Sequence, residues 1–515
     1  MSRDAGDEGT GPEAVRRPAV APLRQTLQRG ALISAGTMVV VQSMSLLTTL
    51  VLARLLTPTE VGVYAAATTL MMFLLSFSEG GMRIALVQRA TDVEDAAETV
   101  FRVTVVSGTL LSFGALVTAP LAGYVFRSDL VAEVAAVSSG MLLVHSLTNV
   151  PDGLMQRNFN FKRRLIIDPL RAVVFAAASI SFAAHHFGVW ALVIGNYLAL
   201  LAWLVGSWTL AGWRPGRGRA SMRLWREMAR FALPLLLQGV VSYAREFIQS
   251  TLIGRRLNAD GLGQYRYGSR LGQLPGMAVV EIGSYVLLPA FSKMLGDTER
   301  LSYAFLRALR IVMVATMPLA GLVLATGESV VVVLLGQQWR PAGGFFVAMA
   351  GYGVGVALQA VASEVIKGSG RSAILNRTSA LHLVVGVGSV FAMLPYGLSG
   401  VGIAISATEV LVGLVVLHLA RRVVVFTVAQ AVGAVLRPAA AAAVALVVVH
   451  PVDAFLARPD HHFFLAAVGL LAVEALLFAV TYVAALRVFD AESCRFLIGA
   501  LGKLGGTARS SLRVR

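Results

Sequence analysis

The sequence predicts an all-α polytopic membrane protein with about fourteen transmembrane helices: two six-helix lobes in a parallel pseudo-two-fold repeat, followed by two C-terminal helices. Its 515 residues are 57% hydrophobic and only 14% charged, which is too apolar for a soluble protein of this size. Apolar runs of roughly 20 residues, long enough to cross the hydrocarbon core, recur from end to end. These runs must be helices, because lipid offers no hydrogen-bond partner to open backbone groups.

A duplicated turn is the third observation that predicts this fold. Residues 53–64 read ARLLTPTEVGVY and residues 254–265 read GRRLNADGLGQY, each between long apolar runs. The two segments align without a gap and share identities at Arg54/Arg255, Leu56/Leu257, Gly62/Gly263 and Tyr64/Tyr265. Two further landmarks correspond in the same order: residues 79–81 with 281–283, and residues 187–189 with 396–398. Matched landmarks at a nearly constant offset predict a duplicated membrane unit.

Taken in order, the chain begins with residues 1–30, whose polar composition without periodicity predicts a disordered cytoplasmic tail rather than a signal peptide. Residues 31–211 form the first lobe, with spans near 31–52, 61–83, 99–125, 130–153, 166–185 and 188–211. A basic linker over 212–229 leads to the second lobe, residues 230–422, with spans near 230–253, 264–290, 303–326, 343–366, 374–395 and 398–420. Residues 423–487 hold two more spans, near 432–450 and 463–486, and residues 488–515 form a basic cytoplasmic tail.

Lys and Arg are unevenly divided between alternate loops, and this division sets the expected orientation. The basic loops are 157–164, 212–229, 293–300, 367–377 and 421–437, whereas the intervening loops hold few basic residues. We therefore expect a multi-pass membrane protein with both termini in the cytoplasm and Trp339 at the outer interface. The formal net charge of +16 then reflects this bias and the anionic headgroups of membrane lipids. No nucleic-acid partner is expected, because the basic residues are dispersed over short loops.

A series of short motifs between Ala31 and Arg422 carries a resemblance to a known family. The motifs are the turn at 54–64, ALVQR (85–89), LMQRNF (154–159) with KRR (162–164), LPAFS (288–292), LGQQWRPA (335–342) and KGSGR (367–371). Their order and spacing resemble the Wzx-type polysaccharide flippases of the MOP superfamily, which include colanic-acid exporters. The resemblance implies a MATE-like fold and alternating-access export of an undecaprenyl-diphosphate-linked oligosaccharide for O-antigen, capsule or exopolysaccharide synthesis. It also implies a polysaccharide polymerase and glycosyltransferases as partners.

Ionisable groups inside the apolar runs are the candidate site residues, because a charge at the centre of a membrane helix costs about 2.5–3.5 kcal/mol on insertion scales. Arginine binds phosphate oxygens in bidentate fashion, which suits the diphosphate that the resemblance implies. The candidate substrate-binding residues are Arg83, Arg245, Arg266 and Arg270. Arg266 and Arg270 share a helix face, because they are four residues apart. The alternative is that Arg245 pairs with a neighbouring acid and that Arg266 and Arg270 snorkel to the surface.

Three acids are candidate ion-coupling carboxylates: Glu79 and Glu281, at matched positions in the repeat, and Glu246. A structural role at the ends of packed helices is the alternative for Glu79 and Glu281. Related flippases often carry an Asp where this chain has Gln249, so a cation site on that carboxylate is not expected here. No cofactor or metal is expected, because Cys494 is the only cysteine and the histidines lack further ligands around them.

Two other function classes stay open on the sequence. A MATE-like, cation-coupled small-molecule antiporter shares the twelve-helix plan, although carboxylates rather than arginines suit a cationic substrate. A non-transporting scaffold or membrane enzyme of polysaccharide assembly is the second alternative. The sequence contains no Walker motif and no Ser/His/Asp arrangement that would support catalysis by this chain.

Overall fold

The computed structural model describes residues 20–79, 81–158, 161–371, 373–456, 464–497 and 499, apart from a few side chains within helices, such as those of Glu79 and Glu281. Over these residues the elements are helices, without a strand. Within the described residues, ten helices are long and apolar enough to cross a membrane, or up to twelve if each of two bent helix pairs is one span. The chain is therefore a multi-pass all-α membrane protein, as the sequence predicts.

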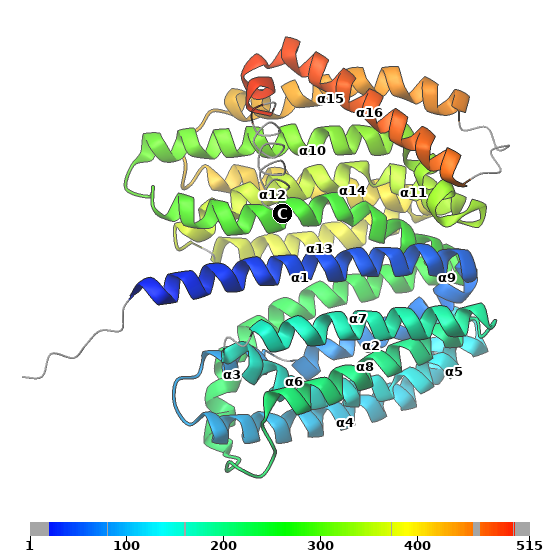
Figure 1. Cartoon of the computed structure of the whole chain (residues 1–515), viewed down its shortest axis with the longest axis vertical. Coiled ribbons are helices and arrows are strands. Elements are labelled where there is room, and N and C mark those ends of the chain that lie inside the picture. Colours follow the sequence, from blue (N-terminus) through cyan, green and yellow to red (C-terminus); the bar gives the residue numbers. More distant parts are fainter. Residues whose placement is uncertain are drawn as a thin grey trace, which may run out of the picture.

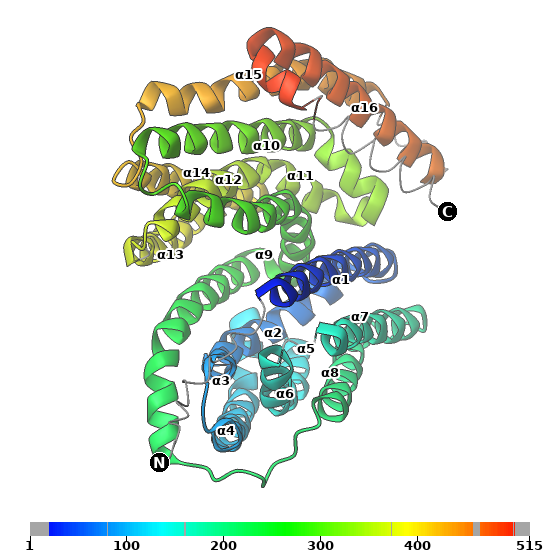
Figure 2. The same ribbon diagram turned by 60° about the vertical axis from the view of Figure 1, so that its left-hand side comes forward.

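The helices form two groups that lie one above the other in Figure 1. The first group comprises α1 (Val20–Leu55), α2 (Pro58–Glu79), α3 (Met82–Gln88), α4 (Val93–Phe126), α5 (Asp129–Ser138), α6 (Gly140–Arg157), α7 (Phe161–Ala184) and α8 (Val189–Ala211). The second comprises α10 (Thr298–Leu335), η1 (Gln337–Trp339), α11 (Arg340–Ala348), α12 (Ala350–Gly368), α13 (Ala373–Met393), η2 (Leu394–Tyr396) and α14 (Gly397–Ala420), with α15 (Val428–Leu456) and α16 (Phe464–Phe489) on its far side. The long helix α9 (Met222–Ser292) connects the two groups (Figure 2). Helices α1 to α8 are called the first lobe below, and α9 to α14 the second lobe.

Two of these candidate spans are unusually long. Each was counted as one span but is long enough to cross the membrane twice. The segment Ala373–Ala420 has 48 residues and contains both α13 and α14, which meet at Gly397, whose φ is 72°. Helix α9 has 71 residues, about 107 Å if it were straight, against about 30 Å of hydrocarbon. It breaks at Asn258, where φ is 62° and ψ is −175°. Counted as two spans each, these segments would bring the candidate spans in the described part of the chain from at most twelve to fourteen, the number that the sequence predicts.

The first copy of the repeated turn, between α1 and α2, is formed by local interactions of its own residues. Thr57 and Glu60 form a capping box at the start of α2: the Glu60 carboxylate accepts from the Thr57 amide at 2.8 Å, and the Glu60 amide donates to the Thr57 hydroxyl at 3.3 Å. Pro58 occupies the first helical position, where its missing N–H costs nothing. The sequence TPTE therefore ends α1 and starts α2 within two residues.

The two copies of the turn lie against each other. A Cβ on Gly62 would meet the carbonyl oxygen of Ala259, and a Cβ on Gly263 would meet the carbonyl oxygen of Pro58. Gly62 and Gly263 are equivalent in the repeat, and so are Pro58 and Ala259. The contact is thus reciprocal, as a pseudo-two-fold axis between the two turns requires. Only glycine allows backbones to approach this closely. The division of the whole chain into domains stays a prediction.

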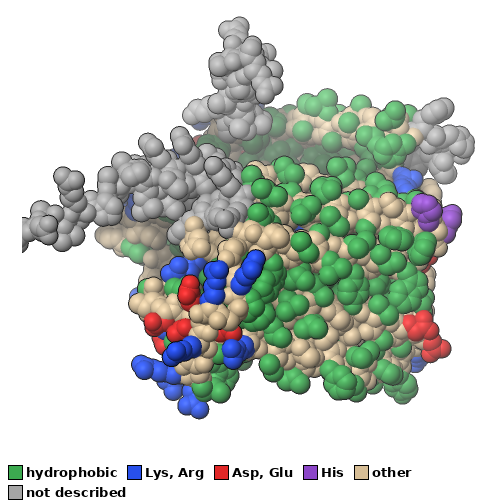
Figure 3. Space-filling model, turned by 60° about the horizontal axis from the view of Figure 1, so that its bottom comes forward, with side chains coloured by type: hydrophobic (Ala, Val, Ile, Leu, Met, Phe, Trp, Pro, Cys, Tyr) green, Lys and Arg blue, Asp and Glu red, His purple; other side chains and the backbone are tan. Residues whose placement is uncertain are grey.

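The outer surface carries a broad band of exposed apolar side chains. On α4 these include Leu110, Phe113 and Val117, which are 66%, 64% and 61% exposed. Figure 3 shows the band across one face of the molecule, with basic side chains gathered mostly at one edge of it. An exposed apolar band of this extent is expected where lipid rather than water covers the protein.

Two expectations need correction. Helix α1 begins at Val20, so residues 20–30, which we expected to be disordered, are helical, while residues 1–19 lie outside the described part. Trp339 does not act as an anchor at a membrane interface, because its side chain is fully buried between the lobes. It stacks on Tyr267 with 4.4 Å between ring centroids and donates from its indole nitrogen to the Ala53 carbonyl at 2.7 Å.

Candidate functional site

A polar cavity of about 730 Å³ lies within the first lobe and reaches the second. Its walls come from α1, α2, α6, α7, α8 and the part of α9 that follows Asn258. Along α1 it extends from Thr37 to Thr48, which places it about 10–27 Å from the Leu55 end of that helix. The polar and charged side chains that line it are Thr37, Ser45, Thr48, Tyr64, Gln156, Asp168, Arg171, Asn196 and Arg270. This is the site that we develop below.

Arg270 is the contribution of the second lobe to this cavity. Its guanidinium donates to the Ser45 backbone carbonyl at 3.2 Å and also contacts the Ser45 hydroxyl on α1. Because Ser45 belongs to the first lobe, this arginine reaches across the boundary between the lobes. Of the four arginines that the sequence singles out, Arg270 lines the polar cavity.

Arg171 on α7 lines the same cavity and was missed by our reading of the sequence. Its guanidinium carbon lies 4.8 Å from the centroid of the Trp203 ring, in a cation–π geometry that holds the side chain. Asp168 lies three residues earlier on α7 and also faces the cavity. The signal was present, since Arg171 and Asp168 are charged residues inside the predicted span 166–185.

Neutral polar groups complete the cavity wall. The Asn196 amide on α8 donates to the Tyr64 hydroxyl on α2 at 2.9 Å, so these two side chains hold each other in place. Gln156 at the end of α6 adds another amide. Arginine guanidiniums bind phosphate oxygens, while amides and hydroxyls exchange hydrogen bonds with sugar hydroxyls. The cavity therefore combines both kinds of group in one space.

Arg83 is engaged elsewhere, on the short helix α3. Its guanidinium nitrogen lies 2.8 Å from the Asp152 carboxylate of α6, and these side chains are 28% and 6% exposed. An almost fully buried carboxylate needs such a partner, because an unpaired charge there would be costly. The geometry therefore gives Arg83 a role in joining α3 to α6.

Arg266 and Glu246 form an ion pair with each other. Their side chains meet at 2.8 Å and are 42% and 49% exposed. Both line a narrow crevice between α9 and α2, next to Thr68 and Thr69. Arg266 thus lies one helical turn from Arg270, as the sequence predicts, but the structure places it in a different crevice, with its charge offset by Glu246.

Arg245 belongs to a buried network in the second lobe. It lies 2.8 Å from His382 of α13 and 3.6 Å from Glu409 of α14, and His382 lies 2.9 Å from the same carboxylate. Gln359 of α12 donates to Glu409 at 2.8 Å. Next to this network the Gln249 amide donates to the Gly386 carbonyl at 3.0 Å. At this position the chain thus presents a neutral hydrogen-bond donor rather than a carboxylate.

Two carboxylates from the sequence analysis, Glu79 and Glu281, have side chains outside the described part. Among the described residues, no group of three or more His, Cys, Asp or Glu could hold a metal ion.

The lobes are fastened to each other at the Trp339 end of the molecule. Gln338 donates to the Ala53 carbonyl at 2.8 Å, next to the bond from Trp339. Arg54 donates in the opposite direction, to the Leu334 carbonyl of α10 at 3.3 Å. Together with the contact between the two glycines, these bonds close the space between the lobes at this end.

Comparison with known proteins gives relatives and a fold neighbour. The chain is 24% identical over 289 residues to the succinoglycan biosynthesis transport protein ExoT of Rhizobium meliloti, covering 56% of this chain and 58% of that protein. It is 25% identical over 329 residues to the lipopolysaccharide biosynthesis protein WzxC of Escherichia coli, covering 62% and 65%. The chain thus spans about three fifths of the length of these relatives.

The solved structure of the lipid II flippase MurJ in an inward closed conformation superposes with a TM-score of 0.73, covering 91% of this chain and 100% of that one. At 15% sequence identity this likeness concerns the fold. The family described as polysaccharide biosynthesis protein matches residues 51–343. Because this match includes more than half of the chain, with both copies of the repeated turn, the chain belongs to this family of polysaccharide biosynthesis proteins.

Proposed function

We propose that this protein is a flippase that carries a lipid-linked oligosaccharide diphosphate across the bacterial cytoplasmic membrane for polysaccharide synthesis. The observation that carries the proposal is the polar cavity, where Arg171 of the first lobe and Arg270 of the second line one space. Its volume of about 730 Å³ suits a headgroup rather than a whole lipid. The relatives with polysaccharide-related names support the same substrate class.

In this mechanism the diphosphate binds first, because two arginines attract an anion most strongly where water is scarce. The sugar then meets the hydroxyl of Tyr64 and the amides of Asn196 and Gln156. Arg270 spans the lobe boundary, so a bound diphosphate would replace its contacts with Ser45 and change how the lobes attract each other. The lipid tail stays in the bilayer while the headgroup moves between the lobes.

Alternating access requires the Trp339 end to part after the headgroup has entered from the opposite end. We assign the Trp339 end to the outer face and both termini to the cytoplasm, because the basic loops lie at the other end. Glycosyltransferases would supply the lipid-linked substrate and a polymerase would consume it. In this scheme the ion-paired residues hold helices in place, namely Arg83, Arg245, Arg266 and Glu246. Arg270 binds the substrate directly.

A cation antiporter fits the cavity less well. Among the described residues, the lining of the cavity contains two arginines, Arg171 and Arg270, and one carboxylate, Asp168. A cationic substrate would meet repulsion from both guanidiniums, whereas an anionic one would be attracted.

Export in cells that depend on this protein tests the proposal. Arg270→Ala and Arg171→Ala should each lower export of the lipid-linked glycan at least ten-fold while membrane expression is unchanged. Lysine at either position keeps the charge without the planar fork, so intermediate export is expected. Arg256→Ala is the matched control, because Arg256 is exposed and lies outside the cavity. Normal export by both alanine variants would overturn the assignment of this cavity.

A further inference from the structure

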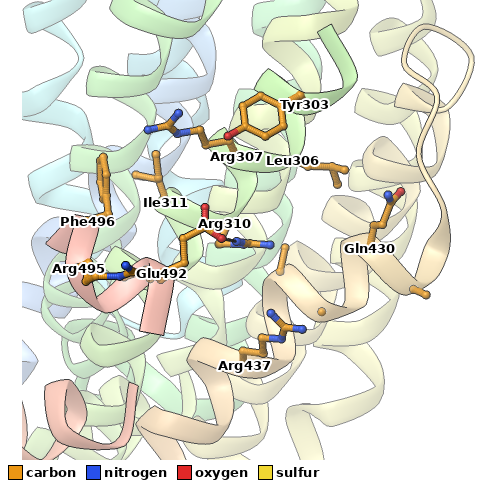
Figure 4. Close-up of a pocket in the computed structure, with 15 residues that line it drawn as sticks. Tyr303, Leu306, Arg307, Arg310, Ile311, Gln430, Arg437, Glu492, Arg495 and Phe496 are labelled. Atoms are coloured by element: carbon orange, nitrogen blue, oxygen red, sulfur yellow. Dashed lines mark hydrogen bonds and ion pairs between the residues drawn. The ribbon is translucent and has the colours of Figure 1, made fainter. Parts of the chain in front are cut away.

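A second cavity, of about 810 Å³, lies apart from the polar cavity, between α10, α15 and the helical residues 491–497 (Figure 4). Four arginines line it: Arg307 and Arg310 of α10, Arg437 of α15, and Arg495. Figure 4 shows Arg437 extending from α15 toward Arg310 on the facing helix. The cavity is therefore built by three segments from distant parts of the sequence, each of which contributes a cation.

The charges in this cavity are only partly balanced. Arg310 pairs with Glu492 at 2.8 Å and lies 3.9 Å from Asp490. By contrast, Arg307 and Arg437 make no ion pair or hydrogen bond with any other residue in the described part of the chain. Four arginines against these two acids leave an excess of two positive charges. The guanidiniums of Arg307 and Arg437 have all their donors available for a ligand.

The arginines lie where the apolar part of each helix begins. Helix α10 carries no charged residue between Arg310 and Glu328, and α15 carries none between Arg437 and Asp453. The 38 residues of α10 are about 57 Å long, so its first turns extend beyond the roughly 30 Å of hydrocarbon. The cavity thus lies at the boundary between headgroups and hydrocarbon, on the side where α10 and α15 begin.

Apart from Gln430 and Ser493, the remaining lining is apolar, and it opens to the surroundings. Ile311 and Val314 follow Arg310 on α10, toward the apolar part of that helix, and form an apolar wall next to the arginines. Tyr303 and Phe496, at 62% and 43% exposure, stand among the lining residues as accessible rings. A ligand that fits this arrangement has an anionic head next to an apolar body.

We propose that this cavity binds an anionic phospholipid, with its phosphodiester on the arginines and its acyl chains along the apolar wall. Basic pockets between transmembrane helices at the cytoplasmic face recognise anionic headgroups in this way, and arginine matches phosphate oxygens well. The excess of two charges suits one or two phosphodiesters. A zwitterionic lipid brings an ammonium group that Arg307 and Arg437 would repel. The site does not depend on the proposed transport, because it shares no lining residue with the polar cavity.

Native mass spectrometry of the full chain in detergent tests this site with three added lipids: phosphatidylglycerol, cardiolipin and phosphatidylethanolamine. The wild-type protein should retain phosphatidylglycerol or cardiolipin at least ten-fold more tightly than phosphatidylethanolamine. The variant Arg307→Ala/Arg437→Ala should lose at least ten-fold in affinity for the anionic lipids, and the corresponding lysine variant should lose less. Both arginines are exposed, so the alanine variant is expected to fold.

Two further variants separate the cavity from general surface charge. The control Arg421→Ala/Arg422→Ala removes the same charge from two exposed arginines outside the cavity and should bind as the wild type does. Gly433→Leu keeps every charge but puts a side chain into the cavity, since a Cβ at Gly433 has no heavy atom within 4 Å. It should weaken binding of the anionic lipids as well.

Several results would overturn the proposal. Equal retention of phosphatidylethanolamine would show that charge does not select the lipid. Unchanged binding in the double alanine variant would place the lipid elsewhere. Displacement of the lipid by inorganic phosphate at equal concentration would make the cavity a site for free phosphate. Preferential displacement by a polyprenyl diphosphate would make it part of the substrate route instead.

Discussion

The contact between Gly62 and Gly263 can be opened by adding a single methyl group on either side. A Cβ placed on Gly62 would lie 2.5 Å from the carbonyl carbon of Ala259, whereas carbon atoms rest at about 3.5–4.0 Å. The carbonyl oxygen of Ala259 lies closer still to that Cβ, so the two turns must move apart by more than about 1 Å if Gly62→Ala is to fit. Overpacking of this kind typically costs about 1–3 kcal/mol when the closed arrangement is kept.

Parting of the lobes relieves that cost, so the substitution should favour the state in which the Trp339 end is open. A bias of about 1–3 kcal/mol changes the open population about 5- to 150-fold. Gly263→Ala should act in the same direction, because it meets Pro58 in the equivalent way. The expected effect therefore concerns the opening of the Trp339 end and requires no change in the polar cavity.

A buried reporter cysteine measures this population. Ala342→Cys places a thiol at a position with no exposure next to Trp339, and Cys494→Ser removes the only native cysteine. The labelling rate with a membrane-impermeant maleimide should rise about 5- to 150-fold when Gly62→Ala or Gly263→Ala is added. Gly114→Ala on α4 is the matched control, since a Cβ there has no heavy atom within 4 Å. Unchanged labelling in both Gly62→Ala and Gly263→Ala, or an equal rise in the control, would refute the reasoning.

Three further predictions concern orientation and stability. Gln337→Cys and Arg217→Cys each introduce a cysteine at an exposed position. In intact cells the cysteine at 337 should react with a membrane-impermeant reagent, whereas the cysteine at 217 should not. The reverse pattern would show that the orientation in the membrane is inverted. Trp339→Phe loses one hydrogen bond and should lower the free energy of unfolding by about 0.5–1.5 kcal/mol. Trp339→Ala should lower it by about 3–5 kcal/mol. Equal unfolding temperatures of the two variants would contradict this. Arg83→Ala leaves the Asp152 carboxylate unpaired and should lower the free energy of unfolding by about 1–3 kcal/mol. Adding Asp152→Asn should restore part of the lost thermal stability. If the pair is unimportant, neither change will alter the unfolding temperature.

The sequence was sufficient for the features that depend on composition and local chemistry. Apolar runs of spanning length predict the helices, because backbone groups in lipid must be satisfied within the helix. The turn after Leu55 follows from TPTE, since Thr57 and Glu60 cap the helix that Pro58 begins. The duplication was visible too, because Gly62 and Gly263 stand at equivalent places in the alignment.

Which charged residues share a cavity was decided by tertiary structure. Arg266 and Arg270 share a helix face in the sequence, yet one meets Glu246 and the other crosses to Ser45. Arg83 is joined to Asp152, 69 positions away along the chain, and no local pattern indicates that pairing.

The burial of Trp339 likewise depends on Ala53, which is contributed by the other lobe. A pattern of apolar and charged residues fixes how a helix sits in lipid, because lipid acts on each helix separately. The partner of each charge depends on how helices pack against one another, and that packing joins residues hundreds of positions apart.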